Sequence, residues 1–525
     1  MVTNLNFKPI IDLPKWRPLA SSPVLFVANT TLSTGYAITS DLRNNEDSHP
    51  FIFGIFPQAA AIDTGLVYGY NTYTDEWQQI GIMGGFSSII HTYAAAAVMP
   101  SQGPKGTLAG GATTTTVTLS TVLPRQVGFN SIANRGDGRG YKVRIIGNAV
   151  GSSGKTEERI VIANTGNTTT PTLTLDSPLS FIPTAGDRYE FLSGKIIITD
   201  NSQNVNVWDI MCNTSKFGGV QGSTTFPVII PLDELYVPYD RVPGEGFLGI
   251  LTATGSGAAT LTGQSILGDA SVLANEYRNF QIRIVTDVGT PTAAGQRRNI
   301  TSHTAGPSPV YTVPAWAVTP SVNAVYVIEN NSDRVLFFNP NSNSVWNYTI
   351  STDTLSTAVW ASRAVALGGS GIVGCQSFGI EPDIAKNARH SYIYLTSGNS
   401  ANSGQQSFDM FDIAGSATGA WTTFGAFENS YYGPSFVTGT NIAYDPITNQ
   451  GRFFYINFNG TQRMFRFDMK YRMLEPFTYL KIAPSMAVTV GQPMAVNSFI
   501  DGNTKLSFLY WVHPNTNAFS VPIIG

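Results

Sequence analysis

The sequence predicts an all-β protein, and three observations support this fold class. Short runs rich in Val, Ile, Thr, Tyr and Phe recur along all 525 residues. Gly, Pro, Asn or Asp interrupts these runs about every ten residues, as in a chain of short strands and turns. Segments with the apolar period of an α-helix are missing. Hydrophobic residues make up 42% of the chain and aromatic residues 11%, which is enough apolar surface for a core in more than one domain.

One unit recurs within this strand pattern: an aromatic or aliphatic strand, a polar turn, and then a Trp or Phe. The copies are residues 68–77, 205–210, 336–346, 410–421 and 464–477. Aromatic side chains at alternate positions can pack between sheets, and the Asp or Asn in the turn favours the reversal of the chain. The unit resembles the hairpin of kelch-like β-propeller blades, which implies a propeller. The alternative is an ordinary hairpin of a β-sandwich or β-helix.

Two stretches rich in Thr, Gly and Ala interrupt the spacing of these units and align with one another. The segment 140–145 matches 279–284, and the segment 154–160 matches 295–300. We interpret the two stretches as one small β-domain, duplicated and inserted into successive blades on the same side of the disc. Because an insertion at a hairpin leaves the core strands untouched, we expect the inserts to be separable from the propeller. The predicted organisation is an extended arm (1–22), a propeller (23–105, 191–248 and 329–525) and two inserted β-domains (106–190 and 249–328).

The second insert carries four short motifs in a fixed order. They are Ile282-Arg283-Ile284, Ala294-Gly295-Gln296-Arg297, Pro314-Ala315-Trp316, and Thr319-Pro320 followed by Tyr326. In this order the motifs resemble a β-domain that recurs in tail and capsid-decoration proteins of bacteriophages. The first insert departs from the pattern, with Lys155-Thr156 after Gly154 and Phe181 at the position of the Trp. The resemblance is confined to the two inserts, and it implies a virion protein.

A propeller with such inserts resembles the nozzle or tail-hub proteins of short-tailed phages. The resemblance implies a non-enzymatic structural subunit, assembled in the bacterial host cytoplasm into a homo-oligomer, expected to be a hexameric ring around the DNA exit channel. Its expected partners are other tail or portal-adaptor proteins and a host surface receptor, with roles in DNA ejection and host attachment. The alternatives are a head-decoration, collar or receptor-binding fibre protein of the virion, and an enzyme, a polysaccharide depolymerase on a propeller scaffold.

The charge balance argues against tight binding of nucleic acid. The chain has 31 Lys and Arg against 34 Asp and Glu, a formal net charge of -3, and no basic run. We therefore expect DNA only to pass through such a ring. Cys212 and Cys375 belong to no zinc or disulfide pattern, so both are expected to be buried apolar residues. The first ten residues lack the features of a signal peptide and no apolar stretch is long enough to span a bilayer, so we expect synthesis in the cytosol and no membrane span.

No catalytic, cofactor-binding or metal-binding residues are predicted, and no cofactor is expected. Residues 151–156 read Gly-Ser-Ser-Gly-Lys-Thr, but Ala149 stands where a phosphate-binding loop needs Gly, so we interpret them as a turn. Arg135-Gly136-Asp137 is interpreted as a Gly-rich turn, with integrin-type adhesion as the alternative. The histidines lack the spacing of metal ligands, so each is expected to be a lone surface or core residue. They are His49, His91, His303, His390 and His513.

Residues 7–23 form a Pro-rich segment that favours an extended arm over a packed element. Such an arm can dock on a neighbouring subunit with Trp16 as its anchor. The residues predicted for this contact are Pro14, Trp16, Arg17 and Pro18. The alternative is that the segment closes the propeller by pairing with the last blade near residues 508–512.

Overall fold

The computed structural model is almost entirely β-strand, which confirms the all-β class. Within the part of the chain that it describes, the helices are represented by a single 3₁₀ turn, η2 (Pro291–Ala293). That part comprises residues 17–21, 37–40, 51–58, 61–83, 95–199, 204–220, 228–235, 247–252, 258–265, 272–338, 344–356, 359–362, 376–380, 391–398, 406–426, 441–445, 452–457, 463–468, 471, 473–479, 494–501, 504–512 and 517–523.

Six four-stranded antiparallel sheets make up most of the described strands, and we number them blades 1 to 6. From the innermost strand outwards, blade 1 is β2 (Ala37–Ser40), β3 (Phe51–Gln58), β4 (Ala61–Asn71) and β5 (Glu76–Met83). Blade 2 is β6 (Ala95–Met99), β13 (Lys195–Thr199), β14 (Asn204–Asp209) and β15 (Thr214–Val220). Blade 3 is β16 (Val228–Pro231), β24 (Arg334–Phe338), β25 (Val345–Thr349) and β26 (Thr354–Ser356). Blade 4 is β27 (Gln376–Ile380), β28 (Ser391–Gly398), β29 (Gln406–Asp412) and β30 (Ala420–Ala426). Blade 5 is β31 (Asn441–Tyr444), β32 (Phe453–Asn457), β33 (Arg463–Asp468) and β34 (Met473–Tyr479). Blade 6 is β35 (Met494–Asp501), β36 (Thr504–Val512), β37 (Asn517–Ile523) and β1 (Arg17–Ser21).

The six blades form a closed ring. Their innermost strands contact one another in the cyclic order β2, β6, β16, β27, β31, β35 and back to β2. The N-terminal strand β1 is the outermost strand of blade 6, where Arg17 pairs with Ser520 of β37. Pro18 also lies in β1, and an edge strand tolerates its missing N–H. A ring of twisted four-stranded sheets closed by both ends of the chain is a β-propeller, the predicted architecture.

Apolar side chains fill the spaces between neighbouring blades. Between blades 1 and 2, the rings of Phe53 and Trp208 meet edge to face, with centroids 6.5 Å apart. Between blades 3 and 4, Phe338 and Phe411 lie 6.4 Å apart in the same manner. Burial of such pairs is the main stabilising term for the ring.

Three outer hairpins share a local pattern in which an aromatic residue donates a hydrogen bond to the turn residue five positions later. The pairs are Tyr70–Asp75, Trp208–Asn213 and Tyr348–Asp353, with donor–acceptor distances of 2.5, 3.2 and 2.9 Å. Each turn residue has a positive φ, a conformation that Asp and Asn adopt more readily than most residues. The first two hairpins lie at predicted copies of the recurring unit. The predicted copy 336–346 is instead the hairpin β24–β25, one strand nearer the axis in blade 3.

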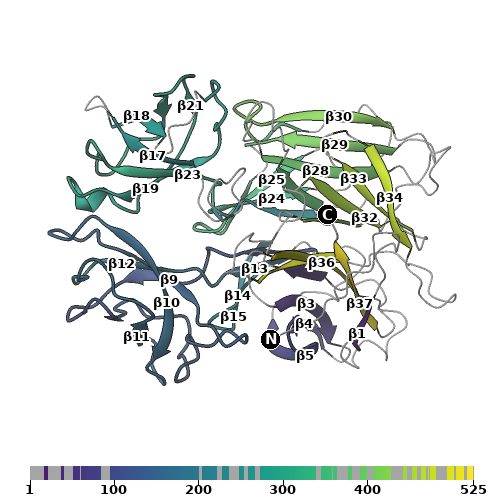
Figure 1. Cartoon of the computed structure of the whole chain (residues 1–525), viewed down its shortest axis with the longest axis horizontal. Coiled ribbons are helices and arrows are strands. Elements are labelled where there is room, and N and C mark those ends of the chain that lie inside the picture. Colours follow the sequence, from purple (N-terminus) through teal and green to yellow (C-terminus); the bar gives the residue numbers. More distant parts are fainter. Residues whose placement is uncertain are drawn as a thin grey trace.

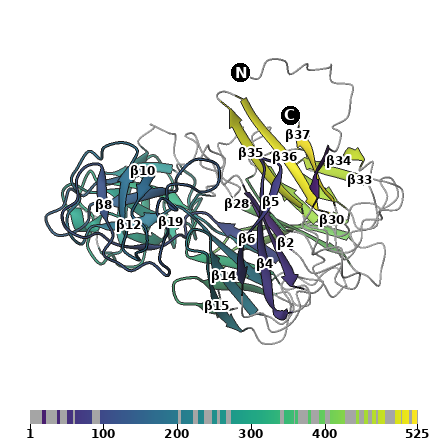
Figure 2. The ribbon, with the colours of Figure 1, turned by 90° about the horizontal axis from the view of Figure 1, so that it is seen from below.

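Two further sheets lie in the chain between the first and second strands of blades 2 and 3. Barrel 1 consists of β7 (Lys105–Thr107), β8 (Thr116–Thr118), β9 (Lys142–Ile146), β10 (Thr156–Asn164), β11 (Thr172–Leu175) and β12 (Arg188–Phe191). Barrel 2 consists of β17 (Phe247–Leu251), β18 (Thr260–Ser265), β19 (Gln281–Thr286), β20 (Arg297–Asn299), β21 (Ser302–His303), β22 (Val310–Thr312) and β23 (Val325–Glu329). Both barrels lie on the left of the propeller in Figure 1, and the view in Figure 2 places them on that side too.

The two barrels have the same strand order. In barrel 1 the order is β7, β12, β9, β10, β11, β8, and a bridge between Leu108 and Leu119 joins the two ends. In barrel 2 the sheet runs β20, β19, β23, β17, β18, β22, β21, and β17 pairs directly with β18 where barrel 1 has the bridge. The ends of this sheet are the consecutive strands β20 and β21. The long strand β10, which pairs with β9 in its first half and β11 in its second, corresponds to the consecutive strands β20 and β21. This identity of order supports the duplication inferred from the sequence.

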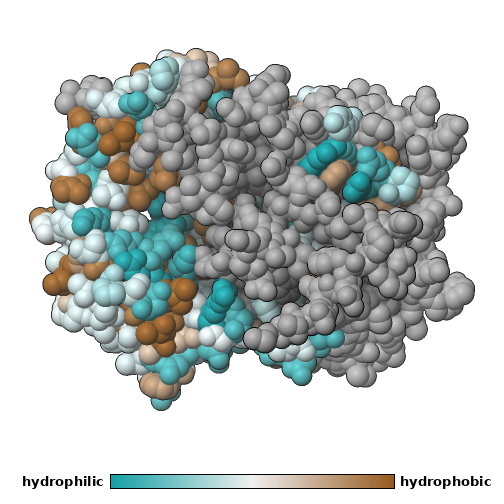
Figure 3. Space-filling view, viewed as in Figure 1, coloured by the Kyte–Doolittle hydropathy of each residue, from teal (hydrophilic) through white to brown (hydrophobic). Residues whose placement is uncertain are grey.

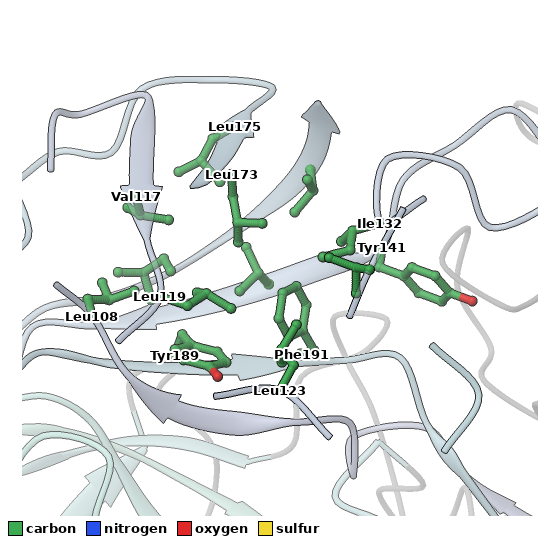
Figure 4. Close-up of a cluster of buried hydrophobic side chains, with 14 of the residues drawn as sticks. Leu108, Val117, Leu119, Leu123, Ile132, Tyr141, Leu173, Leu175, Tyr189 and Phe191 are labelled. Carbon is green, nitrogen blue, oxygen red and sulfur yellow. The ribbon is translucent and has the colours of Figure 1, made fainter. Parts of the chain in front are cut away.

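Each barrel has a hydrophobic core of its own. In barrel 1, Val117, Leu173 and Tyr189 point inwards from three different strands, as Figure 4 shows. In barrel 2, Tyr311 and Tyr326 occupy the interior, with ring centroids 5.8 Å apart. Separate cores of this kind are typical of units that bury their own apolar faces.

Candidate functional site

Charged side chains from both barrels meet the segment that follows β16 in one group, which we call the ionic cluster. Its centre is buried, and Glu158, with a side chain 35% exposed, lies at its edge. Barrel 1 contributes side chains from β7, β9, β10 and β12, and barrel 2 contributes side chains from β19, β20 and β23. The members are Lys105, Arg144, Glu158, Glu190, Glu234, Arg283, Arg297 and Glu329.

Glu190 of β12 is the link between the barrels. Its side chain is 1% exposed, and its Oε2 lies 3.0 Å from Nη1 of Arg144 in the same barrel. Arg297 of barrel 2 donates two hydrogen bonds to the carboxylate of Glu190, from Nη1 to Oε1 at 2.8 Å and from Nη2 to Oε2 at 2.7 Å. Two guanidinium groups on one buried carboxylate fix its position strongly, because both pairs are charge-assisted and directional.

Two consecutive acidic residues, Asp233 and Glu234, lie where the chain leaves blade 3 for barrel 2, and we call this pair the hub. Glu234 belongs to the ionic cluster and Asp233 lies beside it. Glu234 accepts from Nη1 of Arg144 at 2.6 Å and from Nη2 of Arg297 at 3.1 Å, so it contacts both barrels. Asp233 accepts from the backbone N–H and the hydroxyl of Ser101, at 3.0 and 2.8 Å, just after β6 of blade 2. Two consecutive residues thus connect two blades with both barrels.

A second ion pair closes the cluster inside barrel 2. Arg283 of β19 meets Glu329 of β23 in bidentate fashion, at 2.9 and 3.0 Å. Gln281 donates to the same carboxylate at 3.0 Å. Nε of Arg297 lies 3.8 Å from Glu329, which continues the alternation of charge across the barrel interface.

The two hub carboxyls have opposite pKa shifts. Burial raises the pKa of Asp233 to about 7, and the charge of Glu234 adds to the rise. Burial acts on Glu234 in the same direction, but the charges of Arg144 and Arg297 outweigh it and hold its pKa below the usual value. Burial also opposes ionisation of Glu190, whose pKa the charges of Arg297, Lys105 and Arg144 nevertheless hold well below the usual value.

The arrangement immobilises its members. Buried ion pairs add little net stability over apolar side chains, yet removal of one partner leaves an uncompensated charge and costs about 3–5 kcal/mol. The cluster therefore connects the barrels with each other and with the segment that follows β16 of blade 3. Arg297 of barrel 2 contacts both Glu190 of barrel 1 and Glu234 of the segment after β16. That the inserts can be separated from the propeller stays a prediction.

Loops complete the contact between the barrels. Gly154, in the β9–β10 loop, accepts through its carbonyl from the N–H of Asp287 at 2.7 Å. Asn148 of the same loop donates to the carbonyl of Ala294 at 3.3 Å. Residues 151–156, which resemble a phosphate-binding loop, run from this turn into strand β10 rather than into a helix. The prediction of a turn is confirmed, and its role is to contact barrel 2.

Barrel 1 contacts the propeller through the Arg135-Gly136-Asp137 turn. The Arg135 guanidinium pairs with Asp137 at 2.8 Å, and both side chains are nearly buried. Asn71 of blade 1 donates to the Gly136 carbonyl at 3.2 Å, and a Cβ at Gly136 would lie 2.5 Å from the ring of Phe51. The interpretation as a Gly-rich turn is confirmed, and this turn is packed against blade 1 rather than presented for adhesion.

Hairpin tips of the blades reach into both barrel cores. Cys212, a free thiol at the β14–β15 turn of blade 2, is buried in the core of barrel 1, as expected for a small apolar residue. Ala414 at the β29–β30 turn of blade 4 lies in the core of barrel 2. Asn279 of barrel 2 donates to the carbonyls of Ile413 and Ser416 in that turn, at 2.8 and 3.0 Å. Cys375 lies outside the described residues.

The residues predicted for a subunit contact fall partly within the described chain. Arg17 and Pro18 lie in β1, so residues 17–21 of the predicted arm form the outer strand of blade 6. This is the closure alternative, with β37 as the partner strand rather than residues 508–512 of β36. Pro14 and Trp16 lie outside the described residues, and a subunit contact through them stays a prediction.

His303 is the histidine within the described residues, and it is a buried core residue of barrel 2, as one of the two expected settings. The other four histidines lie outside that part. Among the residues that the structure describes, no group of three or more His, Cys, Asp or Glu side chains is placed to hold a metal ion. Nor does the described chain include a helix long and apolar enough to cross a membrane.

Comparisons with known proteins add little to this geometry. No protein-family model matches the chain, and no curated protein matches it. Among solved structures, it is similar to the crystal structure of Saccharomyces cerevisiae Sqt1, with a TM-score of 0.34 and 9% identity over 97% of this chain and 100% of that one. The assignment of a six-bladed propeller therefore rests on the strand order and blade contacts of the described chain.

Proposed function

We propose that the chain is a structural subunit of a bacteriophage virion, a tail nozzle or tail-hub protein that forms a hexameric ring around the DNA exit channel. Its role there is mechanical rather than catalytic: each copy is a rigid block that contacts its neighbours and other tail or portal-adaptor proteins. The protein would assemble in the cytoplasm of the bacterial host, and DNA would pass along the ring without being held.

The observation that carries this proposal is that buried ion pairs hold two similar barrels beside a closed propeller. Glu190 and Glu234, both 1% exposed, are each held by arginines from different barrels. A subunit of a large symmetric assembly must present its contact surfaces at constant spacing, because small angular errors accumulate around a ring. The ionic cluster supplies this constancy.

Two features of the sequence support the virion assignment. The motifs of barrel 2, from Ile282-Arg283-Ile284 to Tyr326, resemble the β-domain of phage tail and decoration proteins. The net charge of -3 suits a channel, because a strongly basic lumen would bind the phosphates and slow the passage of DNA.

Imaging of the purified protein, and of virions labelled with an antibody against it, tests the proposal. Rings of six copies on the tail axis are the expected result. Studs over the head, or fibres that project from the tail, would instead show a decoration, collar or receptor-binding protein. Cleavage of capsular polysaccharide by the purified protein would show a depolymerase and overturn the structural role.

The receptor-binding alternative has one observation in its favour. Apolar side chains lie among polar ones on the barrel surfaces, as the brown patches on the left of Figure 3 show. Phe129 and Val150 of barrel 1 and Val288 of barrel 2 are 78%, 93% and 67% exposed. Loss of adsorption to host cells after Phe129→Ser and Val150→Ser, with normal particle assembly, would favour that alternative.

The predicted contact through the N-terminal segment has its own test. Trp16→Ala should lower incorporation of the protein into particles while leaving its unfolding unchanged, since an interface anchor acts only in the assembly. Incorporation is measured by quantifying the protein in purified virions. Normal incorporation of the variant would remove Trp16 from the interface.

A further inference from the structure

In barrel 2, hydrogen bonds of His303 hold the backbone of residues 275–277, and we call this set of bonds the clamp. Nε2 of His303 accepts from the backbone N–H of Tyr277 at 2.8 Å, and Nδ1 bonds the carbonyl of Thr304 at 3.0 Å. Because a carbonyl can only accept, Nδ1 carries the proton and Nε2 is the lone-pair acceptor. Asn275 completes the clamp: its N–H donates to the His303 carbonyl at 3.1 Å, and its Oδ1 accepts from the His303 N–H at 3.0 Å.

Barrel 1 has the same clamp with Asn164 in place of the histidine. Oδ1 of Asn164 accepts from the backbone N–H of Ile132 at 2.9 Å, and Nδ2 donates to the carbonyl of Thr165 at 2.8 Å. Asn130 again completes the clamp, with its N–H on the Asn164 carbonyl at 3.1 Å and its Oδ1 on the Asn164 N–H at 3.0 Å. Asn130 and Asn275 both have positive φ, 54° and 61°.

The four bonds described have equivalents in both clamps, and Asn164 adds one more, from Nδ2 to the carbonyl of Gly128 at 3.0 Å. The two clamps also differ in one chemical property. An amide oxygen accepts at any ordinary pH, whereas an imidazole nitrogen stops accepting when it is protonated. Protonation of His303 would turn Nε2 into a donor that faces the N–H donor of Tyr277. Asn164 has no such second state.

The surroundings of His303 offer little compensation for a positive charge. The residue is 4% exposed, and its ring lies between the neutral rings of Tyr277 and Tyr311, with centroids at 5.7 and 5.3 Å. Within the described 272–280 segment, the charged residues Glu276 and Arg278 flank Tyr277 in the chain. Arg278 is a cation, and Glu276 already accepts from the N–H of Leu273 at 3.0 Å.

The segment that the clamp holds is also the one that contacts the propeller. Residues 272–280 run from Val272, which pairs with Gly306, through the clamp to Asn279. Asn279 donates to two carbonyls of the β29–β30 turn of blade 4. In barrel 1, the corresponding segment runs from Asn130 to the Gly136 turn that packs on blade 1. Each clamp therefore stabilises the contact between its barrel and a blade.

We propose that acidification releases the contact of barrel 2 with blade 4 through protonation of His303, whereas the equivalent contact of barrel 1 with blade 1 does not respond. The protein thus carries a pH-sensitive device in one of two otherwise equivalent positions. Opening frees residues 272–280 and leaves barrel 1 in place.

The pKa of His303 agrees in direction with this geometry. Burial lowers it, the bond to Thr304 raises it, and the charge of Arg278 lowers it further, for a net value below the usual 6.5. A lowered pKa in the closed state means that the open state binds the proton more tightly. The stabilisation by the clamp is therefore complete above pH 6.5 and is lost as the pH falls from there through the pKa of the closed state.

Hydrogen exchange on the full-length protein tests this proposal, with rates at about pH 7.5 and about pH 5.0 corrected for intrinsic exchange. In the wild type, exchange of residues 272–280 should rise about tenfold at the lower pH, the change that uptake of one proton gives over one pH unit. Residues 410–416 of the blade 4 turn should follow, and residues 130–141 of barrel 1 should not change.

Reciprocal substitutions identify the group responsible. His303→Asn gives barrel 2 the clamp of barrel 1 and should abolish the acid response. Asn164→His should confer the response on residues 130–141, and this test remains valid if the first variant does not fold. Unchanged protection of residues 272–280 in the wild type, or an undiminished response in His303→Asn, would overturn the proposal.

Discussion

Barrels 1 and 2 share one strand order, one clamp and one pattern of attachment, yet each attaches to a different blade. In barrel 1 the segment after the clamp makes a long turn around Gly136 that packs on Phe51 of blade 1. In barrel 2 the corresponding segment is shorter, and Asn279 bonds the β29–β30 turn of blade 4 directly. The strand order and the bonds that satisfy buried backbone groups are retained, whereas the side chains that face the propeller differ.

The ionic cluster joins the barrels into one unit, and breaking it should have the largest effect. Arg297→Met leaves Glu190 and Glu234 buried with fewer compensating charges, so we expect a loss of about 3–5 kcal/mol in the free energy of unfolding. Chemical denaturation measures this loss. Lys216→Met, which removes the exposed ion pair with Asp353, is the control and should cost less than about 1 kcal/mol. Equal effects of the two variants would contradict the importance of burial.

Two equivalent glycines at the barrel interface sharpen the comparison. Gly154 and Gly295 precede β10 and β20 and have positive φ, 69° and 80°. A Cβ at Gly154 would lie 1.9 Å from the Asp287 carbonyl oxygen, whereas a Cβ at Gly295 would meet only the Ile146 side chain at 3.1 Å. Gly295→Ala should therefore cost about 1–2 kcal/mol from backbone strain. Gly154→Ala should cost about 1–3 kcal/mol more from the clash. Thermal unfolding of both variants measures the difference, and the reverse order would show that the barrels can shift apart.

The hub provides a prediction of another kind, a dependence of the free energy of unfolding on pH. Asp233 has a pKa raised to about 7 from the usual 3.8, so its protonated form is the one that favours folding. The contribution of the raised pKa to the free energy of unfolding is complete below pH 3.8 and is lost as the pH rises to about 7. Asp233→Asn removes the titrating group but turns an amide N–H₂ toward the N–H of Leu235 or Ser101, a cost that does not depend on pH. Relative to the wild type, the variant should therefore gain about 1–3 kcal/mol in the free energy of unfolding between pH 4 and pH 8. Denaturation at the two pH values tests this, and a constant difference would exclude titration of Asp233.

Local sequence signals predicted the parts of the fold that local interactions determine. Alternating apolar residues and turn residues predicted strands, and the aromatic unit found hairpins such as β4–β5, because neighbouring residues make those contacts. The match of 140–145 with 279–284 placed β9 and β19 in equivalent positions, since both carry an Arg on the same strand of the same order.

The ionic cluster could not be predicted in this way. Arg144 meets Glu190 and Glu234, which lie 46 and 90 residues away in the chain, and Arg297 meets Glu190 across 107 residues. Isolated charges on half-polar strands are ordinary in a sequence, and only the packing of two barrels brings them together. The clamp could not be predicted from the sequence, because Asn164 and His303 are chemically different residues. Only their hydrogen bonds show that their positions are equivalent.

The pairing of β1 with β37 has a consequence for the synthesis of the protein. The partner of Arg17, Ser520, is made 503 residues later, so Arg17 leaves the ribosome long before its partner exists. At typical rates of synthesis the first strand waits roughly 25 to 100 s for its neighbour. During that time its edge is a possible template for pairing with other chains. A strand of five residues that contains Pro18 offers few free N–H groups, which limits such pairing until the ring can close.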